Sequence, residues 1–140
     1  MRYQKRISGP LLDRFDIVIE VPAVEHDKLL SIEKAECSEI IRARVESARA
    51  IQYERLKSLD LFTNNEIGSA DLDTCAPITQ ETRALLEQAL RGNYLSARGY
   101  TRVRKVALTI ADLAGSDEIT VEHMAEALQY RGQDNVQSYG

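Results

Sequence analysis

The sequence has 140 residues, of which 44% are hydrophobic and 29% are charged, and its formal net charge is −4. This composition fits one globular domain and is not typical of a disordered or fibrous chain. The acidic balance argues against a protein that coats nucleic acid by bulk charge alone, and no apolar run approaches the roughly 18 residues that span a bilayer. We therefore expect a cytoplasmic protein without membrane contacts.

A turn, an apolar pair and one strand are predicted near the N-terminus. Residues 7–16 read Ile-Ser-Gly-Pro-Leu-Leu-Asp-Arg-Phe-Asp, and residues 17–21 are rich in β-branched side chains up to Pro22, which predicts a strand. No later segment of the sequence matches the pattern of a β-strand as well. The strand must therefore pair with a sheet that the sequence does not contain, or with another copy.

Arg14 stands immediately before this predicted strand. Asp13 and Asp16 flank it, so one interpretation is a surface residue in a local ion pair worth about 0–1 kcal/mol. The other interpretation is that Arg14 points at a negative group elsewhere. The residues around Arg14 leave both interpretations open.

Helical patterns follow from about residue 37 to residue 131. The first helix is predicted at 37–59 with Ser38 as a plausible N-cap, and residues 61–78 are predicted to be a connector with at most short helical turns. Apart from Gln52, which interrupts it, the apolar face of this helix consists of Ile41, Val45, Ala48, Leu56 and Leu59.

Three further helix boundaries carry clear signals. A helix is predicted from Thr79, with Thr82 as another start, to Gly92, and the most regular helix runs from Ser96 to Gly115. The last helix is predicted from about residue 120 to 131, with Thr120 as its N-cap but without a capping box to His123. Residues 132–140 are predicted to be a frayed tail.

The helix that starts at Ser96 carries three positive charges on its polar face. At about 100° per residue, Arg98, Arg102 and Lys105 fall within one narrow stripe. The stripe is either an ordinary solvated face or a site for an anion. Arg98 favours the second interpretation, because a cation in the first turn of a helix opposes the helix dipole.

No metal site is expected. The two cysteines, Cys37 and Cys75, form no CxxC pair, and the two histidines, His26 and His123, stand alone. Four scattered residues would have to converge to hold a metal, so we interpret them as packed thiols and surface imidazoles.

Three separated motifs make the sequence similar to a known family. They are residues 6–17, with Leu-Leu-Asp-Arg-Phe at 11–15, residues 95–115, with Ser-Ala-Arg at 96–98, and residues 119–131. In this order they resemble the C-terminal part of the magnesium-chelatase-like AAA+ ATPases of the bacterial ComM (YifB) family. The resemblance covers nearly the whole chain, from about Tyr3 to Arg131.

The resemblance implies a mainly α fold, in which a helical lid bundle of about four helices follows one β-strand of an AAA+ core sheet. It divides the chain into the end of the nucleotide-binding core (residues 1–36), the helical lid (37–131) and a flexible tail (132–140). It further implies that Arg14 is the arginine finger, which reaches the ATP of a neighbouring subunit, and that Arg98 is the sensor 2 arginine. Arg102, one turn beyond Arg98, is a further candidate for contact with ATP.

The family also implies a role and partners. Such a protein is expected to form a ring, as a hexamer, to use ATP and Mg²⁺, and to remodel DNA as a helicase or branch-migration motor in recombination or transformation. One alternative is the ATPase subunit of a metal chelatase, since the motifs are shared by both branches. An alternative of another class is a standalone helical interaction module with no nucleotide role.

Two motifs of an active ATPase are missing from the sequence. It has no GxxxxGK[ST] phosphate loop (Walker A) and no apolar run ending in Asp-Glu (Walker B). We therefore expect the chain to be a fragment that binds no nucleotide and is inactive alone, and that works with its own N-terminal ATPase core and with neighbouring subunits. Whether Arg98 acts within its own subunit or across an interface stays open.

Overall fold

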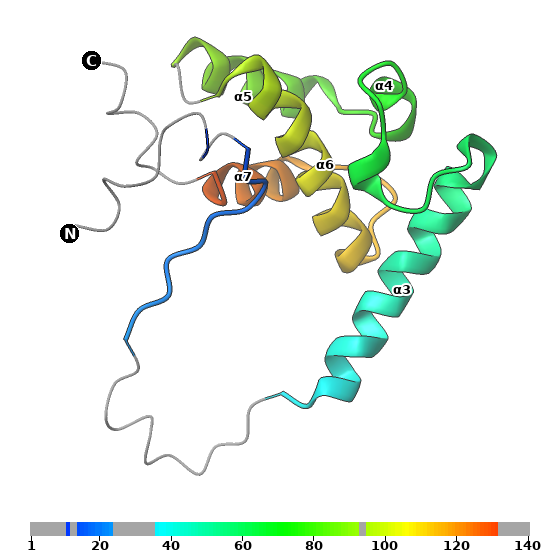
Figure 1. Ribbon diagram of the computed structural model, residues 1–140. Coiled ribbons are helices and arrows are strands. Elements are labelled where there is room, and N and C mark those ends of the chain that lie inside the picture. The colour runs from blue at the N-terminus through cyan, green and yellow to red at the C-terminus, as the bar shows by residue number, and fades with distance from the viewer. Residues whose placement is uncertain (1–10, 12–13, 24–35, 93–94, 132–140) are drawn as a thin grey trace.

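A computed structural model describes residues 11, 14–23, 36–92 and 95–131 (Figure 1). The predicted Gly-Pro turn at residues 9–10, Asp13, His26 and the predicted tail at 132–140 lie outside these ranges. In these ranges the chain forms α3 (Ser38–Leu56), η2 (Lys57–Leu59), η3 (Asn64–Glu66), α4 (Leu72–Cys75), α5 (Gln80–Arg91), α6 (Ala97–Ala114) and α7 (Val121–Gln129). The mainly helical fold predicted from the sequence is confirmed. None of these helices is both long and apolar enough to cross a membrane.

Helix α6 lies at the centre of the bundle and contacts α3, α5, α7 and η3 (Figure 1). Its buried apolar side chains recur at helical intervals and are Val103, Ala107, Leu108 and Ala111. Leu86 of α5 and Met124 of α7 are at most 1% exposed. Burial of side chains of this size contributes roughly 1.5–3 kcal/mol each, so the core around α6 holds the bundle together.

The boundaries of α5 and α6 agree with the prediction. The Thr79 hydroxyl accepts a hydrogen bond from the Thr82 N–H at 3.2 Å, and the Ser96 hydroxyl accepts one from the Gly99 N–H at 3.0 Å. Helix α6 ends at Gly115, whose φ of 66° is left-handed. A side chain would be strained in that conformation, which explains the glycine.

Two predicted helix starts are wrong in detail. Ser38 is the first residue of α3, and Cys37 takes the cap position without a capping hydrogen bond from its side chain. Thr120 and His123 do form a capping box, in which the Thr120 hydroxyl accepts the His123 N–H and His123 Nδ1 accepts the Thr120 N–H at 3.2 Å. The sequence did not predict this box because Glu or Gln usually takes the place of His123, yet a neutral imidazole nitrogen is also an acceptor.

Helix α3 is covered by the rest of the described chain only along its C-terminal half. Ala48, Gln52 and Leu56 are buried, whereas Ile41 and Val45 are 44% and 46% exposed. The other end of α3 extends away from α6 and α7 (Figure 1). The predicted apolar face is therefore buried in one half of the helix and exposed in the other.

A buried polar network joins α3 to α6. Arg55 donates to the two carboxylate oxygens of Asp112 at 2.5 and 3.2 Å, and Asn64 donates to the same carboxylate at 2.8 Å and to Thr109 at 3.0 Å. Asp112 is only 2% exposed. These donors replace the water that a buried carboxylate loses, so the network fixes how α3 lies on α6.

Arg104 of α6 holds α4 in place in a similar way. Arg104 is 3% exposed, and its guanidinium donates to the Ala76 carbonyl at 2.6 Å and to the Asp73 carboxylate at 2.7 Å. It also lies over the Tyr100 ring, 5.5 Å from the centroid. The Ala76 carbonyl lies at the end of α4, where carbonyl groups have no N–H donor within the helix, and Arg104 supplies a donor.

Residues 17–21, for which the sequence predicts a strand, are not part of a strand in the structure. They are exposed, and among the described residues the only β-pairing is an isolated bridge between Ile78 and Ile119. The described chain offers these residues no neighbouring strand. The predicted pairing therefore requires a sheet beyond this part of the chain.

Candidate functional site

The candidate site centres on residues 14–18, which we name the Arg14 segment. Its first residue closes a turn, with the Arg14 N–H donating to the Leu11 carbonyl at 3.0 Å. The Arg14 residue is exposed, and within the described chain its guanidinium makes no hydrogen bond or ion pair. The segment lies beside α6 and α7 and away from α3, the next labelled helix along the chain (Figure 1).

Arg102 of α6 binds this segment. One of its guanidinium nitrogens donates to the Arg14 carbonyl and also to the Asp16 carboxylate, the latter at 3.1 Å. Asp16 therefore pairs with Arg102, whereas the sequence suggested it as a surface partner for Arg14. Asp13, the other suggested partner, lies outside the described residues.

The end of α7 binds the segment from a second side. Arg131 is 7% exposed and donates to the Phe15 carbonyl at 2.6 Å. The Val18 N–H donates to the Tyr130 carbonyl at 2.7 Å. Hydrogen bonds to α6 and to the two residues that follow α7 thus hold the backbone of the Arg14 segment, while the Arg14 side chain stays at the surface.

Arg98 lies in the first turn of α6, two residues after its N-cap Ser96. It is exposed, and its guanidinium makes no hydrogen bond or ion pair with the described part of the chain. The Gly99 N–H is taken by the Ser96 hydroxyl. The helix N-terminus adds positive potential beside Arg98, so this turn is suited to an anion.

The three charges predicted to form one stripe on α6 have different surroundings. Arg98 faces solvent and Arg102 binds the Arg14 segment, whereas Lys105 donates to the Asn65 carbonyl at 2.8 Å. Burial lowers the pKa of Lys105 below its ordinary value. Within the described chain the three side chains therefore have different partners.

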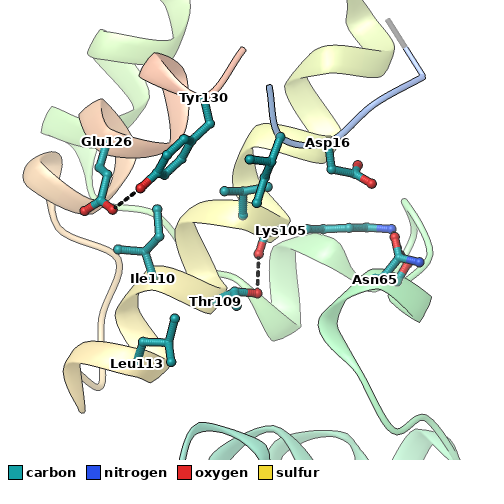
Figure 2. Close-up of a pocket in the computed structure, with 10 residues that line it drawn as sticks. Asp16, Asn65, Lys105, Thr109, Ile110, Leu113, Glu126 and Tyr130 are labelled. Atoms are coloured by element: carbon teal, nitrogen blue, oxygen red, sulfur yellow. Dashed lines mark hydrogen bonds between the residues drawn. The ribbon is translucent and has the colours of Figure 1, made fainter. Parts of the chain in front are cut away.

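A groove lies beside the Arg14 segment, between α6 and α7. Its volume is about 420 Å³, and Figure 2 shows it with Ile110 and Leu113 on one wall and Tyr130 and Glu126 on another. The Tyr130 hydroxyl donates to Glu126 at 3.0 Å, and this hydrogen bond raises the pKa of Tyr130. Most of the lining is apolar. Neither Arg14 nor Arg98 lines the groove, so it is separate from the two candidate arginines.

The described residues offer no cluster for a metal ion. No three His, Cys, Asp or Glu side chains gather in these ranges. Cys37 is exposed and Cys75 is buried, and burial raises the pKa of the Cys75 thiol. His123 belongs to the cap of α7.

The family of the chain follows from comparison with known proteins. A family model described as magnesium chelatase, subunit ChlI C-terminal, matches residues 35–131, and a model described as magnesium chelatase, subunit ChlI, matches residues 1–29. The chain therefore belongs to the magnesium-chelatase-like family, and its helical bundle is the C-terminal domain of such a protein. The resemblance inferred from the sequence motifs is confirmed.

Within this family the chain is similar to proteins of the ComM and YifB type. It is 40% identical over 132 residues to the competence protein ComM of Haemophilus influenzae, an alignment that covers 94% of this chain and 25% of ComM. It is 36% identical over 137 residues to the uncharacterized protein YifB of Escherichia coli, covering 97% of this chain and 26% of YifB. The chain thus spans about a quarter of the length of these relatives.

Proposed function

We propose that this chain carries the arginine finger, Arg14, and the nucleotide-sensing lid of a ring-forming ATPase. One observation carries the proposal: hydrogen bonds to α6 and to residues 130–131 after α7 hold the backbone of the Arg14 segment, while the Arg14 guanidinium is exposed and has no partner in the described chain. An arginine presented in this way suits contact with a phosphate outside its own chain. Its planar fork stays charged and can contact two phosphate oxygens at once.

Arg98 is the second ATP contact of this proposal. Its exposed guanidinium and the N-terminus of α6 suit a phosphate group. The phosphate loop and the Mg²⁺ ligands are absent from this sequence, so the ATPase core of the longer protein would supply them. ATP with Mg²⁺ provides the phosphoryl group for hydrolysis. In well-known NTPases an arginine finger accelerates that step by about 10³–10⁵.

The first experiment replaces Arg14 by Ala in the full-length protein. We expect ATP turnover to fall by about 10²-fold or more, with the ring intact, because the charge that stabilises the transition state is lost. Arg91→Ala is the matched control, since the Arg91 side chain is 84% exposed on α5. Unchanged turnover of Arg14→Ala in intact rings would remove the finger assignment.

Mixed rings test whether Arg14 acts on a neighbour. Subunits with Arg14→Ala keep a working ATP site, and subunits with a disabled phosphate loop keep a working Arg14. If Arg14 acts across the interface, mixing the two inactive proteins restores turnover, because intact sites then meet intact fingers. No recovery over a range of mixing ratios would show that Arg14 acts within its own subunit or not at all.

Arg98→Ala tests the lid contact separately. We expect weaker ATP binding together with lower turnover, because Arg98 would contact phosphate both before and during hydrolysis. Fluorescent-nucleotide titration and steady-state kinetics measure the two effects. If both stay at the level of the Arg91→Ala control, Arg98 has no role at the nucleotide.

The work that ATP drives is proposed to be DNA remodelling by a cytoplasmic hexamer. The name of the Haemophilus influenzae relative, a competence protein, favours this role. Stimulation of ATP turnover by single-stranded or branched DNA, with no response to a porphyrin chelatase partner, is the expected result. The second candidate, a chelatase ATPase subunit, is favoured by the description of the matching family model and predicts the opposite pattern.

A further inference from the structure

We infer that Arg102 and Arg131 are positioning residues, which set the place of the Arg14 guanidinium by holding the backbone carbonyls of Arg14 and Phe15. The inference rests on the proposed function, because it takes Arg14 as the finger. It also assigns Arg102 differently from the sequence analysis, in which Arg102 is a candidate for direct contact with ATP.

The Arg14 segment is held through its backbone carbonyls and one N–H group. Arg102 donates to the Arg14 carbonyl, Arg131 donates to the Phe15 carbonyl at 2.6 Å, and the Val18 N–H donates to the Tyr130 carbonyl at 2.7 Å. Two consecutive carbonyls are thus held by two charged donors, one on α6 and one just after the C-cap of α7. Hydrogen bonds from a charged donor are roughly twice as strong as neutral ones, so they suit the fixing of an otherwise exposed segment.

The Arg102 guanidinium already has two acceptors within the chain. The nitrogen that binds the Arg14 carbonyl also contacts the Asp16 carboxylate at 3.1 Å, and the Arg102 side chain is only 26% exposed. A phosphate contact would have to compete with these acceptors. Arg98, one turn earlier on α6, is exposed and has no such contact in the described chain.

The Arg131 guanidinium also lies close to the first turn of α6. A Cβ atom built on Gly99 would lie 3.5 Å from Nη2 of Arg131 and 2.9 Å from Cδ1 of Leu95. A Cβ atom at position 99 would clash with the Leu95 side chain, whereas its distance to Arg131 is that of an ordinary contact, so the Arg131 guanidinium lies against the first turn of α6. Gly99 follows Arg98 directly, so the turn of α6 that carries the proposed phosphate contact also lies beside the guanidinium of a finger anchor.

These contacts predict a mechanical link between the lid and the finger. Arg98 and Arg102 lie on one continuous helix, so a displacement of α6 at the nucleotide would move the Arg14 carbonyl with it. The ATP in a subunit would then influence the finger that the same subunit offers to its neighbour. A shift of about 1 Å in a reacting group can change a rate by about 10²-fold, so the link need only transmit small movements.

The test is a double-mutant cycle in the full-length protein, with Arg102→Ala, Arg131→Met, Arg14→Ala and the two combinations with Arg14→Ala. We expect each anchor variant to lower kcat about tenfold or more while KM changes less than about twofold. On the Arg14→Ala background the same anchor substitutions should cause no further loss, because they act through Arg14. Arg102→Lys should recover part of kcat, because one ammonium group can donate to both acceptors.

Amide hydrogen exchange of the full-length protein gives a second readout. Arg131→Met and Arg102→Ala should accelerate exchange of the Val18 amide by about tenfold or more while the buried core of α6 stays protected. Arg91→Ala should leave both unchanged. If Arg131→Met does not fold, the partly exposed Arg102 carries the test alone.

The outcomes separate this inference from the proposed function. The positioning role would be overturned if the anchor substitutions lowered kcat on the Arg14→Ala background by the same factor as in the wild type. A raised KM for Arg102→Ala would also overturn it. Unchanged exchange of Val18 in both anchor variants would also overturn it. If Arg14→Ala alone leaves turnover unchanged, the proposed function fails, and accelerated exchange then supports only the anchoring of the segment.

Discussion

Arginine side chains in this chain differ in what accepts their hydrogen bonds. Among the described residues, Arg55, Arg102, Arg104 and Arg131 are arginines that are mostly buried and donate to carboxylates or carbonyls of the chain itself. Arg14 and Arg98 are exposed and make no such contacts with the described residues. The fold explains the first group, whereas the second group is available to groups outside the chain.

Removal of a buried guanidinium should be costly. Arg104→Met is expected to lower the free energy of unfolding by about 3 kcal/mol, because the Ala76 carbonyl loses its donor. The matched control is Arg91→Met, at a residue that pairs with Glu87 only at 3.8 Å. Urea denaturation followed by circular dichroism measures both variants. Equal losses in the two would contradict the role of Arg104 in holding α4.

The capping box of α7 gives a smaller and more selective effect. Thr120→Ala should lower the free energy of unfolding by about 1 kcal/mol, because the His123 N–H loses its acceptor. His123→Gln should preserve most of the stability, since an amide oxygen can accept the Thr120 N–H, whereas His123→Ala should not. Thermal unfolding of the three variants ranks them. If Gln and Ala at position 123 are equally stable, the imidazole contact adds nothing.

Helix boundaries were predictable wherever their signals are local. Thr79 and Ser96 cap their helices through N–H groups three residues away, and Gly115 ends α6 by its own backbone conformation. The burial of α3 was not predictable in the same way. An apolar stripe shows which side of a helix is apolar, but Ile41 is exposed because nothing in the described chain covers it.

The position of α3 depends on the network around Asp112. Arg55→Met should lower the free energy of unfolding by about 3–5 kcal/mol, because it leaves a buried carboxylate without its counter-charge. The double variant Arg55→Met with Asp112→Leu should recover much of that loss, since an apolar pair replaces the charges. Lys57→Met, at an exposed ion pair with Glu54, is the control. Chemical denaturation compares them, and a double variant less stable than Arg55→Met would contradict the prediction.

The candidate site was predictable only where side chains carry the signal. Arg14 and Arg98 stand in short family motifs, so the sequence identifies them as candidates. Arg131 could not be found in this way, because its acceptor is the Phe15 carbonyl 116 residues earlier in the chain. Every residue has a carbonyl, so no sequence pattern marks this contact.

The stability of the whole domain should decrease in acid. The pKa values of three carboxyl groups are lowered in the folded chain: Glu66 accepts backbone N–H groups of Phe62 and Thr63, Asp73 binds Arg104, and Glu122 contacts the Thr120 hydroxyl. The unfolded chain then binds more protons than the folded one at low pH. These contributions are fully present above the ordinary carboxyl pKa values of 3.8 and 4.5 and are lost as the pH falls through the lowered ones.

Urea midpoints between pH 7 and pH 2 test this dependence. We expect little change down to about pH 5 and a progressive decrease below it. Glu66→Gln removes one titrating group and keeps an oxygen that can accept, so it should flatten the curve. A midpoint that stays constant throughout the acid range would contradict the assigned carboxyl contacts.

Several apolar side chains of residues 17–21 are exposed outside the bundle. Ile17, Ile19 and Val21 are 54%, 65% and 79% exposed, and the chain spans about a quarter of its relatives. Exposed β-branched residues of this kind suit pairing with a sheet, and the strand predicted here stays a prediction. The proposed core of the full-length protein would cover them.

The hydrogen bonds from Arg102 and Arg131 to backbone carbonyls place different evolutionary constraints on the donor residues and on the residues that they hold. A carbonyl is the same in every residue, so this hold tolerates any side chain at positions 14 and 15 that fits the turn. Substitution at positions 14 and 15 is then limited by the turn and by the molecules that these side chains contact outside the chain. Substitution at positions 102 and 131 is limited by the need to donate to the two carbonyls. A related protein could therefore carry a different side chain at position 14 and keep the same hydrogen bonds to the backbone of the segment.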